Sequence, residues 1–325
     1  MAQQEKKRAI RRLKSVYALR AKVDESYQEG QEAMKAGPPT VWGMLNFYYG
    51  DPILKAMGIH SVYPENYGAA AAALGEAGKY LDYADAEGVP THLCGYSRVN
   101  IGYAAMMMKE AGGNIPPGAP MGGIPKPLFL MSSAAICDHR YKWFQSLGRY
   151  MDVPVWSFEA PLPGIKELYI GEAYEKAADM GTRHLKDFIT FVENISGRKM
   201  DWAKLEETVD LMLELNHLWY DTNLLRQAVP CPMHSRDFWT AMPPALFSMG
   251  DLKDDLECYK NLKNEIQERV DNGIGAVEEE KFRLLFAELP RGTACGSLTN
   301  WPKGAGISSS RVSGITRPSL STSAG

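Results

Sequence analysis

Hydrophobic residues recur at helical spacing in two long parts of the chain. Residues 5–36 predict one long helix, although no strong capping residue marks its start. The pattern is helical again from residue 163 to residue 280. One apolar stripe of that region, at a spacing of about 3.6 residues, contains Leu205, Val209, Met212 and Leu213. The chain therefore combines an N-terminal helix with a long helical segment after its middle.

Short apolar runs rich in β-branched and aromatic residues lie between these helices and predict buried strands. The three runs in the first half are 38–50, 127–133 and 153–161. A helical pattern that starts after Cys137 separates the last two runs, and strand–helix–strand order implies a parallel βαβ unit. We therefore predict an α/β fold, in which residues 37–162 form a flavodoxin-like or Rossmann-like parallel-sheet domain.

The pattern changes again in the last part of the sequence. Residues 281–290, "KFRLLFAELP", predict the first strand of a second α/β domain. Residues 291–325 are dominated by Ser, Gly, Thr and Pro, and the simple interpretation is an irregular tail. The codons for this stretch can be chosen so that a reading frame shifted by one base encodes aromatic and β-branched residues in the alternation typical of a strand. Our hypothesis is that the chain is out of frame after about Pro290 and that the second domain is incomplete, which the nucleotide sequence would decide.

Composition and charge exclude several classes of partner. Hydrophobic residues make up 45% of the 325 positions, charged residues 23%, and the formal net charge is −3. This balance favours neither nucleic acid nor an anionic membrane as the main partner. No signal-peptide pattern and no run of about 18 apolar residues is found. We expect a cytoplasmic protein whose five cysteines stay reduced.

Two of the cysteines share a sequence context. Cys94 in "THLCGYSR" and Cys137 in "AAICDHR" each follow an extended pattern and precede a helix. Ligands gather at the carboxyl ends of parallel strands, where helix N-termini favour a thiolate. Arg98 and Arg140, within about one helical turn of these cysteines, would add positive charge. The alternative is that both cysteines are small buried residues at strand ends.

Four segments carry a resemblance to a known family. They are "VYPENYGA" (62–69), "THLCGYSR" (91–98), "PMGGIPKPLFLMSSAAICDHRYKWFQSLGRYMDVPVW" (120–156) and "PMHSRDFW" (232–239). Together they resemble the 2-hydroxyacyl-CoA dehydratase / benzoyl-CoA reductase family, most closely subunits of the 2-hydroxyglutaryl-CoA dehydratase D-component type. The resemblance extends from about residue 10 to Pro290.

The resemblance implies a [4Fe-4S] cluster held by three cysteine thiolates of one subunit. On that pattern Cys94 and Cys137 match two of the metal ligands. The third ligand would come from the second α/β domain, and Cys295 of the tail is not assigned to this role. Soft thiolates suit iron–sulfur chemistry, and an iron without a cysteine can bind substrate or water.

The resemblance also implies a function and a set of partners. An iron–sulfur subunit of this kind relays a low-potential electron from an ATP-dependent activator protein to an acyl-CoA thioester, which forms a ketyl radical. A related sister subunit would complete a heterodimer in an anaerobic lyase or oxidoreductase. A non-catalytic partner subunit or a clusterless fragment is the alternative, and a zinc enzyme built on Cys94, Cys137 and a histidine is a third interpretation.

Further residues are candidates on the same pattern. Glu65 in "YPEN" is interpreted as the catalytic carboxylate near the open iron, or alternatively as a helix-capping residue. His92 would face the same side as Cys94 if the segment between them is extended. Arg98 and Arg140 would contact the cluster or CoA phosphates, or form ordinary surface ion pairs. Two residues of "MHSRDFW" that would reach substrate or only tie the helical segment to the sheet are Ser235 and Arg236.

Overall fold

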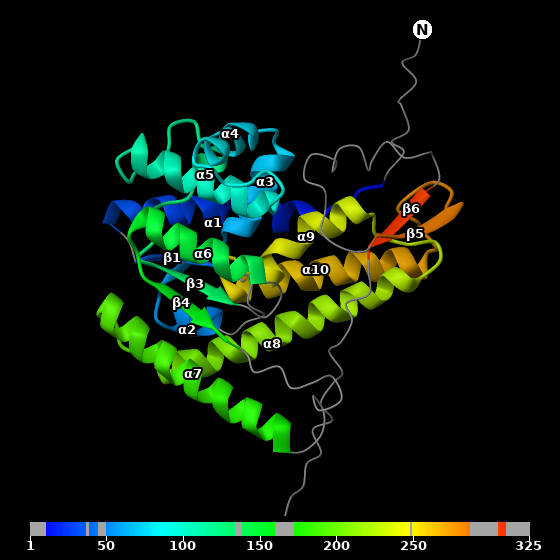
Figure 1. Cartoon of the computed structure of the whole chain (residues 1–325). Coiled ribbons are helices and arrows are strands. Elements are labelled where there is room, and N and C mark those ends of the chain that lie inside the picture. The colour runs from blue at the N-terminus through cyan, green and yellow to red at the C-terminus, as the bar shows by residue number, and fades with distance from the viewer. Residues whose placement is uncertain are drawn as a thin grey trace, which may run out of the picture.

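The computed structural model describes most of the chain (Figure 1). The described residues are 11–36, 39–44, 50–133, 138–159, 172–247, 249–286 and 305–309. The strands are β1 (Thr40–Gly43), β2 (His60–Val62), β3 (Phe129–Ser133), β4 (Val155–Phe158), β5 (Phe282–Phe286) and β6 (Ala305–Ser309). The α-helices are α1 (Val16–Ala36), α2 (Asp51–Ala56), α3 (Pro64–Ala73), α4 (Gly78–Ala86), α5 (Gly95–Lys109), α6 (Asp138–Met151), α7 (Glu172–Ser196), α8 (Trp202–Leu224), α9 (Ser235–Phe247) and α10 (Leu252–Asp271).

Four parallel strands form the central sheet in the order β2-β1-β3-β4. The register aligns Trp42 of β1 with Val62 of β2 and with Leu130 of β3, and Leu130 in turn with Val155 of β4. This is the strand order of flavodoxin-like folds. The predicted α/β fold with a parallel sheet is therefore confirmed.

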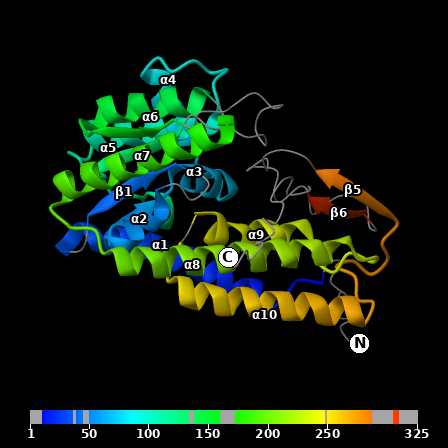
Figure 2. The same ribbon diagram turned by 90° about the horizontal axis from the view of Figure 1, so that it is seen from below.

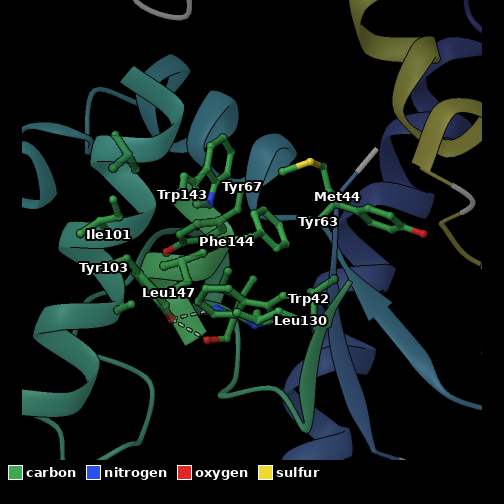
Figure 3. Packing of buried hydrophobic residues seen from close by; sticks show 14 of the residues in the cluster. Trp42, Met44, Tyr63, Tyr67, Ile101, Tyr103, Leu130, Trp143, Phe144 and Leu147 are labelled. Carbon is green, nitrogen blue, oxygen red and sulfur yellow. Dashed lines mark hydrogen bonds between the residues drawn. The ribbon is translucent and has the colours of Figure 1, made fainter. Parts of the chain in front are cut away.

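Helices cover both faces of this sheet, and the alternation of side chains along the strands explains why. Val41 and Phe129 point into a core with α2 and α7. Trp42 and Leu130, one position further along each strand, point into the opposite core with α5 and α6. Figure 3 shows this second core, in which Trp42 and Leu130 lie against Tyr103 and the α6 side chains. The buried apolar side chains of β1 and β3 alternate between these two cores, because both strands are covered on both faces.

A separate hydrophobic core holds the helical segment together. It contains buried side chains of α8, α9 and α10, among them Trp219, Phe238 and Tyr259. Helix α1 joins this core to the sheet, because Val16 and Leu19 pack in the helical core while Tyr27 packs in the α5/α6 core. Figure 2 shows α1 between the sheet layers and the pair α8–α10.

The four apolar residues that the sequence predicted to form one stripe of α8 do not all face the same core. Met212 is buried, but Val209 is 36% exposed and Leu213 is 50% exposed. The buried face instead runs through Thr208, Leu215 and Trp219. Apolar residues occur on two faces of this helix. The spacing of about 3.6 residues therefore did not separate the buried positions from the exposed ones.

Two observations concern the end of the chain. Strand β5 forms inside the predicted strand 281–290, and it pairs in parallel with β6. Strand β6 lies within residues 291–325, which the sequence pattern predicted to be irregular.

A bilayer-spanning segment is absent from the described helices, because none combines sufficient length with sufficient hydrophobicity.

Close contact between α4 and α5 provides the first test of the fold. A Cβ atom at Gly102 of α5 would lie 1.8 Å from the backbone oxygen of Tyr80 in α4. We expect Gly102→Ala to lower the free energy of unfolding by about 2–3 kcal/mol, because backbone must move to relieve the overlap. The matched control is Gly181→Ala in α7, where nothing lies within 4 Å and alanine should stabilise by about 0.5–1 kcal/mol. Urea unfolding of both variants measures the difference, and equal effects would contradict the proposed close contact.

A buried carboxyl group gives a second test. Asp255 of α10 is fully buried, and burial raises its pKa from its ordinary value of 3.8 to about 7, against an opposing effect of Lys55 and Lys22. Because the folded protein binds this proton more tightly than the unfolded chain, stability should fall as the pH rises from about 4 to 7.

The substitution Asp255→Asn removes the titrating group. The slope attributable to Asp255, at most about 1.4 kcal/mol per pH unit in this window, should disappear in urea titrations of the variant. Asp254→Asn is the control, because the Asp254 side chain is 65% exposed. If Asp255→Asn keeps the wild-type slope, the buried carboxyl does not titrate as stated.

Candidate functional site

Cys94 is the N-cap residue of α5 and its side chain is exposed. The segment before it is a turn, with the amide of Leu93 donating to the carbonyl of Pro90, and it is not a strand. The prediction that Cys94 ends a strand is therefore wrong. The thiol nevertheless lies at the N-terminus of a long helix, where the helix dipole favours negative charge.

The backbone at Cys94 is held by two hydrogen bonds from its own helix. The amide of Arg98 donates to the carbonyl oxygen of Cys94 over 3.1 Å. The hydroxyl of Ser97, which is fully buried, donates to the same oxygen over 2.8 Å. Ser97 thus lies in the first turn of α5, and its hydroxyl binds the carbonyl oxygen of Cys94, the N-cap residue of the same helix.

Cys137 itself lies outside the described residues, but the elements on either side of it are described. Strand β3 ends at Ser133 and helix α6 begins at Asp138. In the first turn of this helix, the Nε2 atom of His139 lies 2.6 Å from Oγ of Ser97. The first turns of α5 and α6 are therefore in direct contact, although 42 positions separate these two residues.

A second polar contact joins α6 to α3. Nη2 of Arg140 and Oε2 of Glu65 form an ion pair at 2.5 Å, and the two side chains are only 5% and 18% exposed. Two of the residues predicted for the site are thus brought together. Charge-assisted hydrogen bonds of this kind are stronger than neutral ones, and partial burial limits screening by solvent.

Asn100 of α5 completes the connection between α3 and α5. Its side-chain nitrogen donates to the carbonyl of Pro64 in α3 over 2.9 Å and to the carbonyl of Tyr96 over 2.8 Å. The side chain is fully buried beside Gly68. The N-terminal turns of α3, α5 and α6 therefore form one polar cluster, made of Glu65, Cys94, Ser97, Asn100, His139 and Arg140.

Aromatic side chains pack beneath this polar cluster. Tyr67 of α3 and Tyr103 of α5 make an edge-on contact with ring centroids 5.1 Å apart, and Trp143 of α6 is buried in the same core. Figure 3 shows Tyr67, Trp143 and Phe144 between the helices. Burial raises the pKa of Tyr67 and Tyr103 above the ordinary value, so both hydroxyls stay protonated at neutral pH.

Two other predicted site residues have different surroundings. Arg98 forms an ion pair with Asp85 of α4 and donates to the carbonyl of Thr91 over 3.4 Å. It therefore fastens the turn that carries Cys94 to α4. His92 is exposed within that turn, so the argument from an extended strand does not apply to it.

Ser235 and Arg236 belong to a different part of the molecule. They form the first turn of α9, which packs against α1 and β6. The amide of Arg236 donates to Nδ1 of His234 over 3.1 Å, and Ser235 is buried. The structure does not bring these residues to the polar cluster of α3, α5 and α6.

Ser97 and Asn100 belong to this polar cluster, although the sequence did not indicate a function for either residue. Cys94 occupies the N-cap position of α5, and Ser97 lies three residues further along the chain, inside the helix. Ser97 lies within the segment "THLCGYSR" that carries the family resemblance, but only the packing of three helices reveals the contacts of Ser97 and Asn100. Among the described residues, no group of three His, Cys, Asp or Glu side chains is placed to hold a metal ion.

Comparison with known proteins identifies the family. A profile of the family "2-hydroxyglutaryl-CoA dehydratase, D-component" matches residues 46–308, which is more than half of the chain. The fold is α/β and the chain belongs to this family, as the sequence segments predicted. The match continues beyond Pro290, through a stretch that was predicted to be out of frame.

Similar proteins carry subunit names from acyl-CoA enzymes. The alpha subunit of (R)-2-hydroxyisocaproyl-CoA dehydratase from Clostridioides difficile is 26% identical over 268 residues, which cover 82% of this chain and 61% of the relative. The alpha subunit of (R)-phenyllactyl-CoA dehydratase from Clostridium sporogenes is 27% identical over 306 residues, 92% of this chain and 67% of the relative.

A third similar protein comes from a reductase. One of the subunits of benzoyl-CoA reductase from Thauera aromatica is 25% identical over 228 residues, covering 67% of this chain and 50% of the relative. The chain thus spans about half to two thirds of the length of these curated relatives. Its relatives include subunits of both dehydratases and reductases.

The ion pair between α3 and α6 can be tested by substitution. We expect Glu65→Gln to lower the free energy of unfolding by about 3 kcal/mol, because Arg140 would lose this charged partner while remaining buried. Glu172→Gln in the exposed pair with Lys176 is the control, and it should cost only a few tenths, up to about 0.5 kcal/mol. Urea unfolding at pH 7 distinguishes the two, and equal small losses would show that the α3–α6 pair contributes little.

Proposed function

We propose that this chain is an iron–sulfur subunit of an enzyme of the 2-hydroxyacyl-CoA dehydratase / benzoyl-CoA reductase type. The observation that carries the proposal is the 2.6 Å contact between His139 and Ser97. It joins the first turn of the helix capped by Cys94 to the first turn of the helix that follows Cys137. Membership of the family supports the same conclusion.

The residues present are compatible with a [4Fe-4S] cluster as far as they are described. Cys94 offers an exposed thiol at a helix N-terminus, and the proposed second ligand, Cys137, immediately precedes α6. Thiolates at helix N-termini are suitable ligands for iron because the helix dipole stabilises their negative charge. When bound, such a cluster would supply one-electron reduction to an acyl-CoA thioester.

Glu65 and Arg140 have proposed roles beside the cysteines. The Arg140 guanidinium holds Oε2 of Glu65, and the two side chains are mostly screened from solvent. A carboxylate fixed in this way is oriented for proton transfer, and we assign Glu65 as the acceptor of a proton from the substrate. Arg140 is its positioning residue, because it contacts the carboxylate and keeps its direction.

The proposed partners follow from the type of enzyme. The relatives are all named as subunits, which implies a complex of several chains. We propose a related sister subunit and an ATP-dependent activator protein as the partners of this chain. The alternative is a non-catalytic partner subunit or a clusterless fragment, and measurement of iron separates it from the proposal.

The test compares two cysteine variants of the full chain. After anaerobic reconstitution with iron and sulfide, wild-type protein should bind iron and show thiolate-to-iron absorption. Cys94→Ala should lose most of this iron, because each thiolate contributes strongly to affinity. The control is Cys258→Ala, which removes a half-buried thiol of α10 that packs in the helical core.

Iron determination and the visible spectrum are the readouts, and urea unfolding verifies that both variants are folded. Wild-type protein without iron, or equal iron in Cys94→Ala and Cys258→Ala, would overturn the proposed function. Zinc in place of iron would favour the alternative zinc site on the same thiols.

A further inference from the structure

Helix α8 carries large apolar side chains on its exposed surface as well as on its buried face. Trp202, Val209, Leu213 and Leu224 are 61%, 36%, 50% and 42% exposed, respectively. Successive members of this set are 7, 4 and 11 positions apart, which correspond to about two, one and three helical turns. The four side chains therefore follow one line along the helix, which we call the exposed row of α8.

The contacts that hold α8 in the molecule use other sides of the helix. Leu215 and Trp219 face the core of the helical segment. Glu207 forms an ion pair with Lys253 of α10 at 2.7 Å. The exposed row is therefore not needed to attach α8, and a continuous line of exposed apolar side chains is typical of an interaction surface.

Charged and polar residues along one edge of the row restrict how a second helix can lie on it. Glu206, Asp210 and His217 are exposed, and their separations of 4 and 7 positions place them on a line of their own beside the row. A copy of α8 running in the same direction would place Glu206 and Asp210 against the same two carboxylates. Repulsion between like charges disfavours this parallel arrangement.

An antiparallel arrangement of two α8 helices is self-complementary. A twofold axis at Leu213 places this residue against Leu213 of the second copy. Trp202 and Leu224 each lie 11 positions from Leu213, on opposite sides of it, so each meets the other across the axis. Asp210 and His217 lie 3 and 4 positions from Leu213, also on opposite sides, so Asp210 of one copy faces His217 of the other. Apolar residues thus meet apolar residues, and the carboxylate meets a histidine.

We propose that the exposed row of α8 binds a second copy of this chain, with the two α8 helices antiparallel about Leu213. The symmetric spacing about Leu213 and the matching of Asp210 with His217 identify the partner as the same chain. The inference goes beyond the proposed function and does not rest on it, because α8 contributes no residue to the polar cluster of α3, α5 and α6.

The first measurement is sedimentation velocity of the full chain over a series of concentrations. Wild-type protein should change from monomer to dimer as its concentration rises. Leu213→Glu places two carboxylates together at the axis and should weaken dimerisation by about tenfold or more. The matched control is Leu74→Glu at the end of α3, where the leucine is 53% exposed, and it should dimerise like wild type.

The second measurement tests the antiparallel register. His217→Glu places a carboxylate opposite Asp210 of the second copy and should weaken dimerisation several-fold. Adding Asp210→Lys to His217→Glu restores an opposite-charge pair and should return the dimer dissociation constant toward the wild-type value. Urea unfolding verifies that every variant is folded, because all the substituted side chains are exposed.

Three outcomes would overturn the proposal. Wild-type protein that stays monomeric at every concentration, including a monomer that associates only with a different subunit, would show that a second copy does not bind the row. A dimer that Leu213→Glu leaves unchanged, or that Leu74→Glu weakens equally, would place the interface elsewhere. Failure of Asp210→Lys to rescue His217→Glu would contradict the antiparallel register.

Discussion

The rest of the structure depends on a parallel sheet that is buried on both of its faces. The inner strands of the central sheet supply apolar side chains in two directions, so Val41 and Trp42 of β1 belong to different cores. Helix α6 must return across one face to connect β3 with β4, and it therefore starts at the carboxyl edge of the sheet. Its first turn is placed at this edge by the burial of the sheet.

The polar cluster exists because three helices begin close together. Helix α5 enters from a turn and not from a strand, yet Gly102 permits it to approach α4 closely, and Asn100 bonds it to α3. Backbone amides at the starts of helices are not fully paired within the helix, and they attract negatively charged groups. A cluster assembled from such turns offers backbone amides that can interact with negatively charged groups.

The sequence predicted β3 and α6 well because a short apolar run followed by a charged helical pattern has one simple interpretation. Glu65 and Arg140 were both candidate site residues, and the structure pairs them in an ion pair that the sequence did not predict, while their role in a site stays a prediction. The turn before Cys94 was misread, because Pro90 and the residues after it are compatible with an extended segment as well as with a turn. Periodicity likewise could not separate the two apolar faces of α8, on which Leu213 is exposed.

The contacts between Ser97 and His139 could not be predicted from sequence at all. The two residues are far apart along the chain, and each has an ordinary local interpretation as a polar residue near a helix start. Only the angle at which α5 and α6 pack brings Oγ and Nε2 together. Long-range geometry of this kind is set by the shapes of many core side chains and not by a motif.

Helix α1 has a mechanical consequence for the molecule. Its first turns pack with α9 and α10, and the residues just before it are fixed to them by Glu265, Arg269 and Asp237. Its second half packs under the sheet, where the hydroxyl of Tyr27 donates to Asn66 over 2.6 Å. Helix α1 is thus packed into both the core of the helical segment and the α5/α6 core of the sheet. A hinge motion between these two parts would have to bend the helix or pull one of its ends out of its core.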